Sequence, residues 1–145
     1  MSRGYITIAQ NSEDNDYLEM SYALALSLKA TQDLCVCVDE GTKKLITNKH
    51  KKVFDAIVDI PWNDDAKGDK WKIHNKWKYP HMTPYDETII LDSDMIFTES
   101  VDYWWDYLGK KDVWCCTNVK TFRNEDVTSD YYRKKFTQLN LPNVY

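Results

Sequence analysis

Leu34–Gly41, with the sequence LCVCVDEG, is the stretch that most constrains the fold. An unbroken apolar run from Leu34 to Val38 is followed at once by Asp39 and Glu40. Strands of a parallel sheet are covered on both faces, and such strands read as continuous apolar runs. The stretch therefore predicts a buried parallel strand whose carboxyl end opens into a polar loop.

Other apolar runs on either side of this stretch predict further strands. They lie at residues 5–9, 56–60, 88–91 and 113–117. Pro61 ends the run at 56–60, because proline disfavours continuation of regular structure on either side of it. The run at 88–91 is the one that we most expect to be buried.

Helical spacing appears between these strands. Tyr17, Met20, Leu24 and Leu28 recur at three- and four-residue steps, which predicts an amphipathic helix over residues 17–29 capped by Asp14 or Asp16. Further helices are predicted over residues 45–54, 69–79 (broken by Pro80), 101–108 (ended by Gly109) and 130–139. Strands that alternate with helices are typical of an α/β fold, with a mainly parallel sheet flanked by helices.

The composition is that of one globular domain spanning residues 1–145. Apolar residues make up 43% of the chain and charged residues 29%, and no apolar run reaches the roughly 20 residues that span a bilayer. The N-terminus shows no secretory pattern, so a cytoplasmic location is expected. The net charge of −4 weighs against a nucleic-acid partner. Lysines and tryptophans do interleave over 67–78, as in single-strand binders, but a solvated helix with apolar anchors explains that pattern as well.

The cysteines Cys35, Cys37, Cys115 and Cys116 fall on predicted strands. Their spacing differs from the usual ligand spacing of zinc sites, although zinc remains an alternative. We therefore expect buried, reduced thiols.

Polar residues follow the carboxyl ends of the predicted strands. In open α/β sheets, ligands bind at these ends. Gln10 and Asn11 follow the first strand, Asp39 the second, and Asp92 and Asp94 the run at 88–91. Residues two apart in an extended chain project to the same side, so Asp92 and Asp94 are expected to face one cation while Ser93 points away from it. Carboxylate oxygens suit Mn²⁺ or Mg²⁺. A plain exposed strand end is the alternative.

The segment Thr88–Phe97, TIILDSDMIF, resembles the hydrophobic-Asp-X-Asp segment of GT-A glycosyltransferases, especially the family 8 type related to glycogenin and bacterial galactosyltransferases. Pro84-Tyr85-Asp86 resembles the loop that precedes the motif in that group. The resemblance implies a Rossmann-like GT-A fold. It also implies a metal-dependent transfer of a sugar from a nucleoside diphosphate sugar to an acceptor, which is a glycan, a lipid or a protein.

The resemblance also implies roles for individual residues. Ala9, Gln10, Asn11 and the Asp39 loop would cradle the nucleoside. Asp92 and Asp94 would meet the metal and the ribose–diphosphate region, with Ser93 between them as a substrate contact. Lys72 or Lys76 would be the basic residue that contacts the sugar nucleotide, and a solvated helix face is the alternative for both lysines. Family members usually carry a later histidine at the metal, yet no histidine follows His81 here. We therefore expect an N-terminal portion of a longer protein, a differently completed site or a defective one.

Two other functions remain open on the sequence. One is a domain that binds nucleotide sugars or a partner without turnover. The other is a haloacid dehalogenase-like phosphatase, in which Asp92 would be the nucleophile and Asp94 its acid–base partner.

Overall fold

The computed structural model describes residues 1–28 and 33–108. The elements expected at 113–117 and 130–139, together with Gly109, Cys115 and Cys116, lie outside the described residues. The chain forms two compact units, Met1–Tyr103 and Trp104–Tyr145. In the second unit the structure describes α5 (Trp105–Leu108), which is preceded by the 3₁₀ turn η2 (Asp102–Trp104), so the short helix expected over 101–108 is confirmed. No helix in the described ranges has the length and apolar character needed to cross a membrane.

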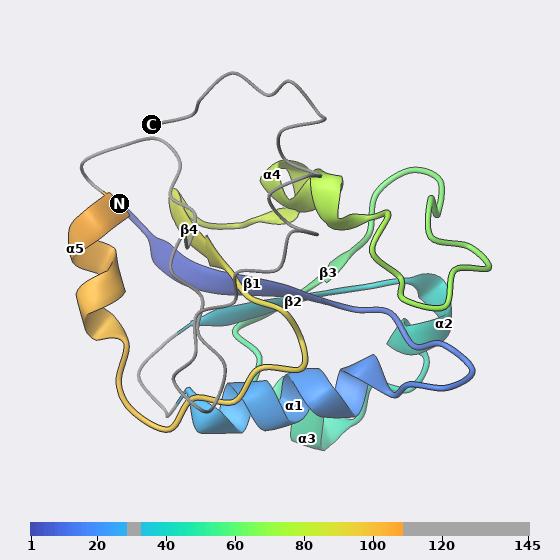
Figure 1. Ribbon diagram of the computed structural model, residues 1–145, viewed down its shortest axis with the longest axis horizontal. Helices are drawn as coiled ribbons and strands as arrows, with labels where there is room; N and C mark the ends of the chain where they lie inside the picture. Colours follow the sequence, from blue (N-terminus) through green and yellow to red (C-terminus); the bar gives the residue numbers. More distant parts are fainter. Residues whose placement is uncertain (29–32, 109–145) are drawn as a thin grey trace, which may run out of the picture. The chain divides into compact units, whose positions relative to one another are not determined.

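Four strands of the first unit form one sheet within the described residues. They are β1 (Arg3–Ala9), β2 (Leu34–Val38), β3 (Ala56–Asp59) and β4 (Glu87–Ile90). All of them are parallel, in the order β3-β2-β1-β4, and Tyr5 pairs with Leu34 on one side and Ile89 on the other. Figure 1 shows α1 and α3 on one side of the sheet and α4 on the other. The expected Rossmann-like α/β fold, a parallel sheet flanked by helices, is confirmed.

The two inner strands form the buried centre of this sheet. β2 is buried along its whole length, and β1 is buried from Gly4 to Ala9. The expectation that residues 88–91 form the most buried strand is wrong, because β4 lies at an edge of the sheet that the described residues form and Ile90 is 55% exposed. An edge strand has a neighbour on one side only, so fewer side chains cover it.

The first helix, α1 (Tyr17–Ser27), begins at the predicted cap. The Asp16 side chain accepts a hydrogen bond from the Glu19 backbone N–H at 3.1 Å. Leu18, Ser21 and Leu24 form the buried face, whereas Tyr17 and Met20 of the expected face are half-buried. Leu28, the C-terminal cap residue, is buried as expected.

The single helix expected over 45–54 is wrong, because only one short helix lies in that range and a second short helix precedes it. The preceding helix is α2 (Glu40–Lys43), and the helix within the range is α3 (Asn48–Lys51). Asp39 starts α2 by accepting from the Thr42 N–H at 2.7 Å, and the Thr47 N–H donates to His50 Nδ1 at 3.0 Å at the start of α3. These local side-chain contacts satisfy backbone groups and so break the segment into two turns.

The helix expected over 69–79 is also wrong. Residues 69–75 are irregular, and they lead into a 3₁₀ turn, η1 (Lys76–Lys78), and then α4 (Tyr79–Met82). Pro80 lies in the first turn of α4 rather than ending a helix, a position where its missing N–H removes no helical bond. Lys78 is buried, and its Nζ donates to Asn63 O, to Asn75 Oδ1 at 2.8 Å and to Asp65 Oδ2 at 3.2 Å. Polar contacts, not helical periodicity, shape this segment.

Candidate functional site

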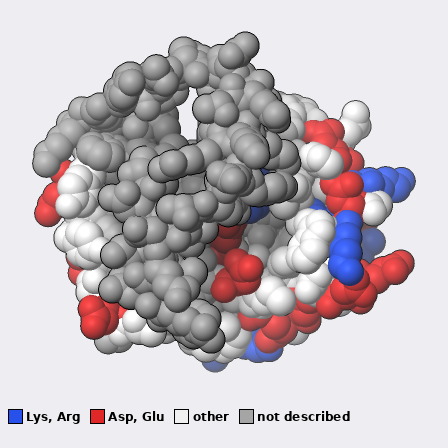
Figure 2. Space-filling view, viewed as in Figure 1, with Lys and Arg blue, Asp and Glu red and all other residues white. Residues whose placement is uncertain are grey.

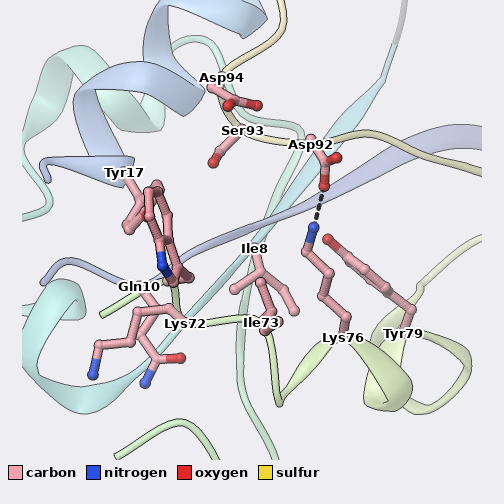
Figure 3. Close-up of a pocket in the computed structure, with 11 residues that line it drawn as sticks. Ile8, Gln10, Tyr17, Lys72, Ile73, Lys76, Tyr79, Asp92, Ser93 and Asp94 are labelled. Atoms are coloured by element: carbon pink, nitrogen blue, oxygen red, sulfur yellow. Dashed lines mark hydrogen bonds and ion pairs between the residues drawn. The ribbon is translucent and has the colours of Figure 1, made fainter. Parts of the chain in front are cut away.

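A pocket of about 140 Å³ opens at the carboxyl ends of β1 and β4. The residues expected at the site that line it are Gln10, Lys72, Lys76, Asp92, Ser93 and Asp94. Figure 3 shows Lys76 and Asp92 joined on one side of Ile8, with Tyr17 and Lys72 on the other. The structure thus brings two lysines and two aspartates from distant parts of the chain into one cavity.

Gln10 enters the pocket directly from the end of β1. Its side chain is buried, and its Oε1 accepts a hydrogen bond from Asn75 Nδ2 at 2.9 Å. Asn75 also donates to Asp64 Oδ1 at 2.7 Å. The amide of Gln10 is therefore fixed by residues 61–78, called here the polar segment, which also carry Lys72 and Lys76.

Asp92, Ser93 and Asp94 follow β4, but the chain stops being extended there. The Leu91 N–H donates to Ile6 O at 2.9 Å, and a turn then closes from the Met95 N–H to Asp92 O at 3.3 Å. Because of this turn, the extended geometry expected for the two carboxylates is wrong. Ser93 is buried and lines the pocket, while Asp92 and Asp94 are exposed, and Figure 3 shows the Asp92 carboxylate turned toward Lys76 and that of Asp94 apart from this pair.

Lys76 and Asp92 form an ion pair between Nζ and Oδ1 at the mouth of the pocket, and both side chains are exposed. Next to them, Tyr79 is buried. Burial raises the pKa of the Tyr79 phenol, and Cys37 and the Asp92 carboxylate add to that rise. Tyr79 is therefore a neutral O–H donor at neutral pH.

Lys72 lines the pocket with its stem, and its Nζ donates to Ala66 O at 3.0 Å. Its backbone adopts φ = 51°, in the left-handed region. A side-chain-bearing residue there costs roughly 1–2 kcal/mol relative to the right-handed region. Such strain is often retained at functional positions.

Ala9, Asn11 and Asp39 do not line the pocket. Ala9 is buried in β1 opposite Val38. Asn11 Oδ1 accepts from the Leu18 N–H at 2.9 Å, and Asp39 caps α2. These residues shape the loops after β1 and β2, and Asp39 does lie along the same edge of the sheet as Gln10 and Asp92, since the strands before them are parallel.

Five lining residues were not expected from the sequence: Ile8, Tyr17, Trp71, Ile73 and Tyr79. Tyr17 opens the helix that follows the loop after β1, so its position near the carboxyl edge was a usable signal. Trp71 and Ile73 belong to the interleaved stretch at 67–78, and they are 66% and 52% exposed. Their exposure was not expected, because the sequence pattern predicts both residues to be apolar anchors of a helix.

The side chains at the end of β4 carry oxygen atoms, which are the ligands that hard ions prefer. No group of three or more His, Cys, Asp or Glu side chains that could hold a metal occurs in the described part of the chain. Asp92, Asp94 and the Ser93 hydroxyl nevertheless offer oxygens, and Mg²⁺-type ions are usually bound through one or two carboxylates plus substrate phosphates and water. Cys35 and Cys37 are free and buried in β2, as expected, and a contact with Cys35 together with burial raises the pKa of the Cys37 thiol.

Comparison with known protein families finds no match, and comparison with curated proteins finds no relative. Function is therefore inferred from the geometry of the pocket.

Proposed function

We propose that the pocket binds a nucleoside diphosphate sugar together with Mn²⁺ or Mg²⁺, and that the protein transfers the sugar to a glycan, lipid or protein acceptor. It would then be a metal-dependent glycosyltransferase of the GT-A type. The observation that supports this most strongly is the meeting of Lys72 and Lys76 with Asp92 and Asp94 in one cavity. That cavity lies at the carboxyl edge of a parallel sheet, where such ligands bind.

The mixture of charges favours a metal–diphosphate complex over either part alone. Asp92 and Asp94 would hold the ion, which stabilises negative charge on the departing diphosphate as a Lewis acid. Lys76 neutralises Asp92 in the ligand-free protein and is positioned to offset the charge of a diphosphate. Tyr79 adds a neutral O–H donor at the same wall.

The size of the cavity indicates which part of the donor it encloses. Sites that enclose whole cofactors measure roughly 300–1,000 Å³, whereas this cavity measures about 140 Å³. We therefore expect it to hold the diphosphate end. Tyr17 and the exposed ring of Trp71 line it as well, and both offer aromatic faces on which the nucleobase can stack.

A nucleic-acid partner is not part of this proposal. The net charge is −4, and Figure 2 shows acidic and basic side chains side by side along one edge of the face in view. Nucleic-acid binders need clustered lysines and arginines to neutralise phosphates. We propose a cytoplasmic enzyme acting on small donors.

The phosphatase alternative is less well supported. That family places its nucleophilic aspartate after the first strand, whereas here Gln10 follows β1 and Asp92 follows the edge strand β4. A domain that binds nucleotide sugars without turnover is distinguished by assay: it would bind the donor with metal but release no nucleoside diphosphate.

Calorimetric titration tests the proposal. The probes are UDP, GDP, ADP and CDP and their glucose conjugates, each with and without Mn²⁺. We expect metal-dependent binding of at least one probe, and Asp92→Asn or Asp94→Asn should weaken it by about tenfold or more, the loss of roughly one charge-assisted contact.

Asp59→Asn is the matched control, because Asp59 also ends a strand of the sheet and pairs with a lysine, Lys43, at 2.7 Å. It should leave donor binding unchanged. If the unmodified protein binds no probe in a metal-dependent way, the proposal is wrong.

A further inference from the structure

Two exposed tryptophans and a histidine form an aromatic platform, defined here as Trp62, Trp77 and His81. The indoles of Trp62 and Trp77 are stacked with ring centroids 5.7 Å apart and planes 16° apart. His81 packs against Trp62 and Trp77 at close to right angles, with centroids at 5.0 Å and 6.3 Å. Trp62 is 65% exposed and Trp77 is 58% exposed, so the packing of the chain leaves large apolar ring surface in water.

The platform is built on a fixed polar frame. Trp77 donates its indole N–H to Asp65 Oδ2 at 3.0 Å. The buried Lys78 pairs with the same carboxylate, donates to Asn63 O beside Trp62, and lies 5.6 Å from the centroid of Trp77. The buried ammonium therefore holds the Trp77 indole and the backbone next to Trp62, and a rigid surface loses little conformational entropy when it binds a ligand.

Trp62 also holds an unfavourable backbone conformation. Its φ is 61°, in the left-handed region, where a bulky side chain is strained and glycine is not. Burial of the indole does not explain the residue, because the side chain is mostly exposed. Strain kept at an exposed aromatic residue points to a binding role.

We propose that the aromatic platform binds a neutral glycan, with the C–H face of a pyranose ring stacked on an exposed indole. Charges within the frame cancel, since Lys78 pairs with Asp65. Lys78 is also buried, so its ammonium cannot reach a nucleic-acid phosphate. This balance favours an uncharged partner.

The arrangement of the rings favours a glycan over other neutral or cationic partners. Nearly parallel indoles leave no groove between them for a proline-rich helix, which docks between aromatic ridges. A quaternary ammonium is bound inside a cage of aromatic rings that face it from several sides, and these stacked indoles form no such cage. The ammonium of Lys78 also already lies over the Trp77 ring. The inference goes beyond the donor pocket: it stands whether or not the protein transfers sugar.

Two-dimensional ¹H–¹⁵N NMR tests this directly, because the sequence contains 6 tryptophans and so gives few indole signals. Trp62→Phe and Trp77→Phe assign the two signals of interest. The protein is titrated with cellohexaose, maltohexaose and mannohexaose, and separately with oligothymidine and a proline decapeptide. We expect at least one hexasaccharide to shift both signals, with affinity reduced about fivefold or more in Trp62→Ala and Trp77→Ala.

Trp71→Ala is the matched control, because Trp71 lies in the same polar segment and is equally exposed but belongs to no stack with Trp62 or Trp77. It should leave glycan affinity unchanged. The inference is overturned if no hexasaccharide shifts the Trp62 and Trp77 signals, if Trp71→Ala weakens binding as much as Trp77→Ala, or if only the oligonucleotide or the peptide shifts them. Asp92→Asn should leave the glycan titration intact, so failure of the donor proposal and failure of this one are distinguishable.

Discussion

The strand pair β1–β2 is almost wholly buried, whereas the segment 61–78 is mostly exposed and buries only a few side chains, and different forces hold the two regions. Ile6, Ile8, Cys35 and Cys37 pack with residues of α4 into an apolar core. In the segment, the buried side chains include Asn75 and Lys78, which are held by hydrogen bonds to named partners. Apolar packing tolerates small changes, whereas a buried polar group costs free energy as soon as one partner is lost. Both candidate sites therefore depend on the region that is more sensitive to the loss of a single contact.

The largest expected effect comes from the strand pair. Ile6 is fully buried, and Ile6→Ala should lower the free energy of unfolding by about 2–5 kcal/mol, since it removes apolar contacts and leaves a cavity. Urea denaturation measures this loss. The same substitution in the segment, Ile73→Ala, should change stability by less than about 0.5 kcal/mol because Ile73 is 52% exposed. Equal losses of unfolding free energy in Ile6→Ala and Ile73→Ala would contradict the difference between the two regions.

The next effect belongs to the polar segment. Asn75→Ala removes the amide that joins Gln10, Asp64 and Lys78, and it should destabilise the protein by roughly 1–3 kcal/mol. It should also weaken metal-dependent donor binding, because Gln10 loses the hydrogen bond that fixes its amide in the pocket. Asn63→Ala is the control: Lys78 bonds to the backbone carbonyl of Asn63, which the substitution keeps. Unchanged donor binding in Asn75→Ala would show that the network does not organise the pocket.

A polar contact outside the segment 61–78 is expected to contribute less to stability than the Asn75 network. Asp16 caps α1 through the Glu19 N–H, and Asp16→Ala should cost about 1 kcal/mol. Asp14, the other expected cap, instead forms an exposed ion pair with Lys70, so Asp14→Ala should cost less than about 0.5 kcal/mol. Thermal melts of the two variants compare them, and a larger loss for Asp14→Ala would contradict the observed cap.

The smallest effect is a dependence on pH within the segment. Burial alone would raise the pKa of the Asp64 carboxyl, but hydrogen bonds from Asn75 and the Ala66 N–H, together with the nearby Gln10 amide and Lys72 ammonium, outweigh it and lower the pKa below its ordinary value of 3.8. A lowered folded-state pKa adds stability that is complete above the ordinary value and is lost as the pH falls through the folded-state value. Asp64→Asn should therefore flatten the acid side of the stability profile, measured by urea unfolding from about pH 6 to about pH 2.5. An unchanged acid side would show that these hydrogen bonds add no stability.

The same contrast explains what the sequence predicted. The apolar run Leu34–Val38 forces a buried strand, so the parallel sheet followed from pattern alone. The segment 61–78 has no period, and its shape follows from contacts such as Asn75 with Gln10 that join residues 65 positions apart. Residue chemistry near strand ends identified Gln10, Asp92 and Asp94 as neighbours, and the family resemblance suggested Lys72 and Lys76; all five line one pocket. The turn after β4, and the exposure of Trp62 and Trp77, depend on contacts that no local pattern records.

The pairing of β1 with both β2 and β4 also bears on the order of folding. Strand β2 follows β1 closely in the chain, whereas the Arg3–Glu87 contact between β1 and β4 joins residues 84 positions apart. Closing a longer loop costs more entropy and delays long-range pairing. Pulsed hydrogen exchange during refolding should thus protect β2 before β4, and simultaneous protection would contradict this order. The pocket lined by Gln10 and Asp92 needs the turn after β4, so it would be assembled last. An intermediate that has only β1, β2 and β3 in place would have a sheet but no such pocket.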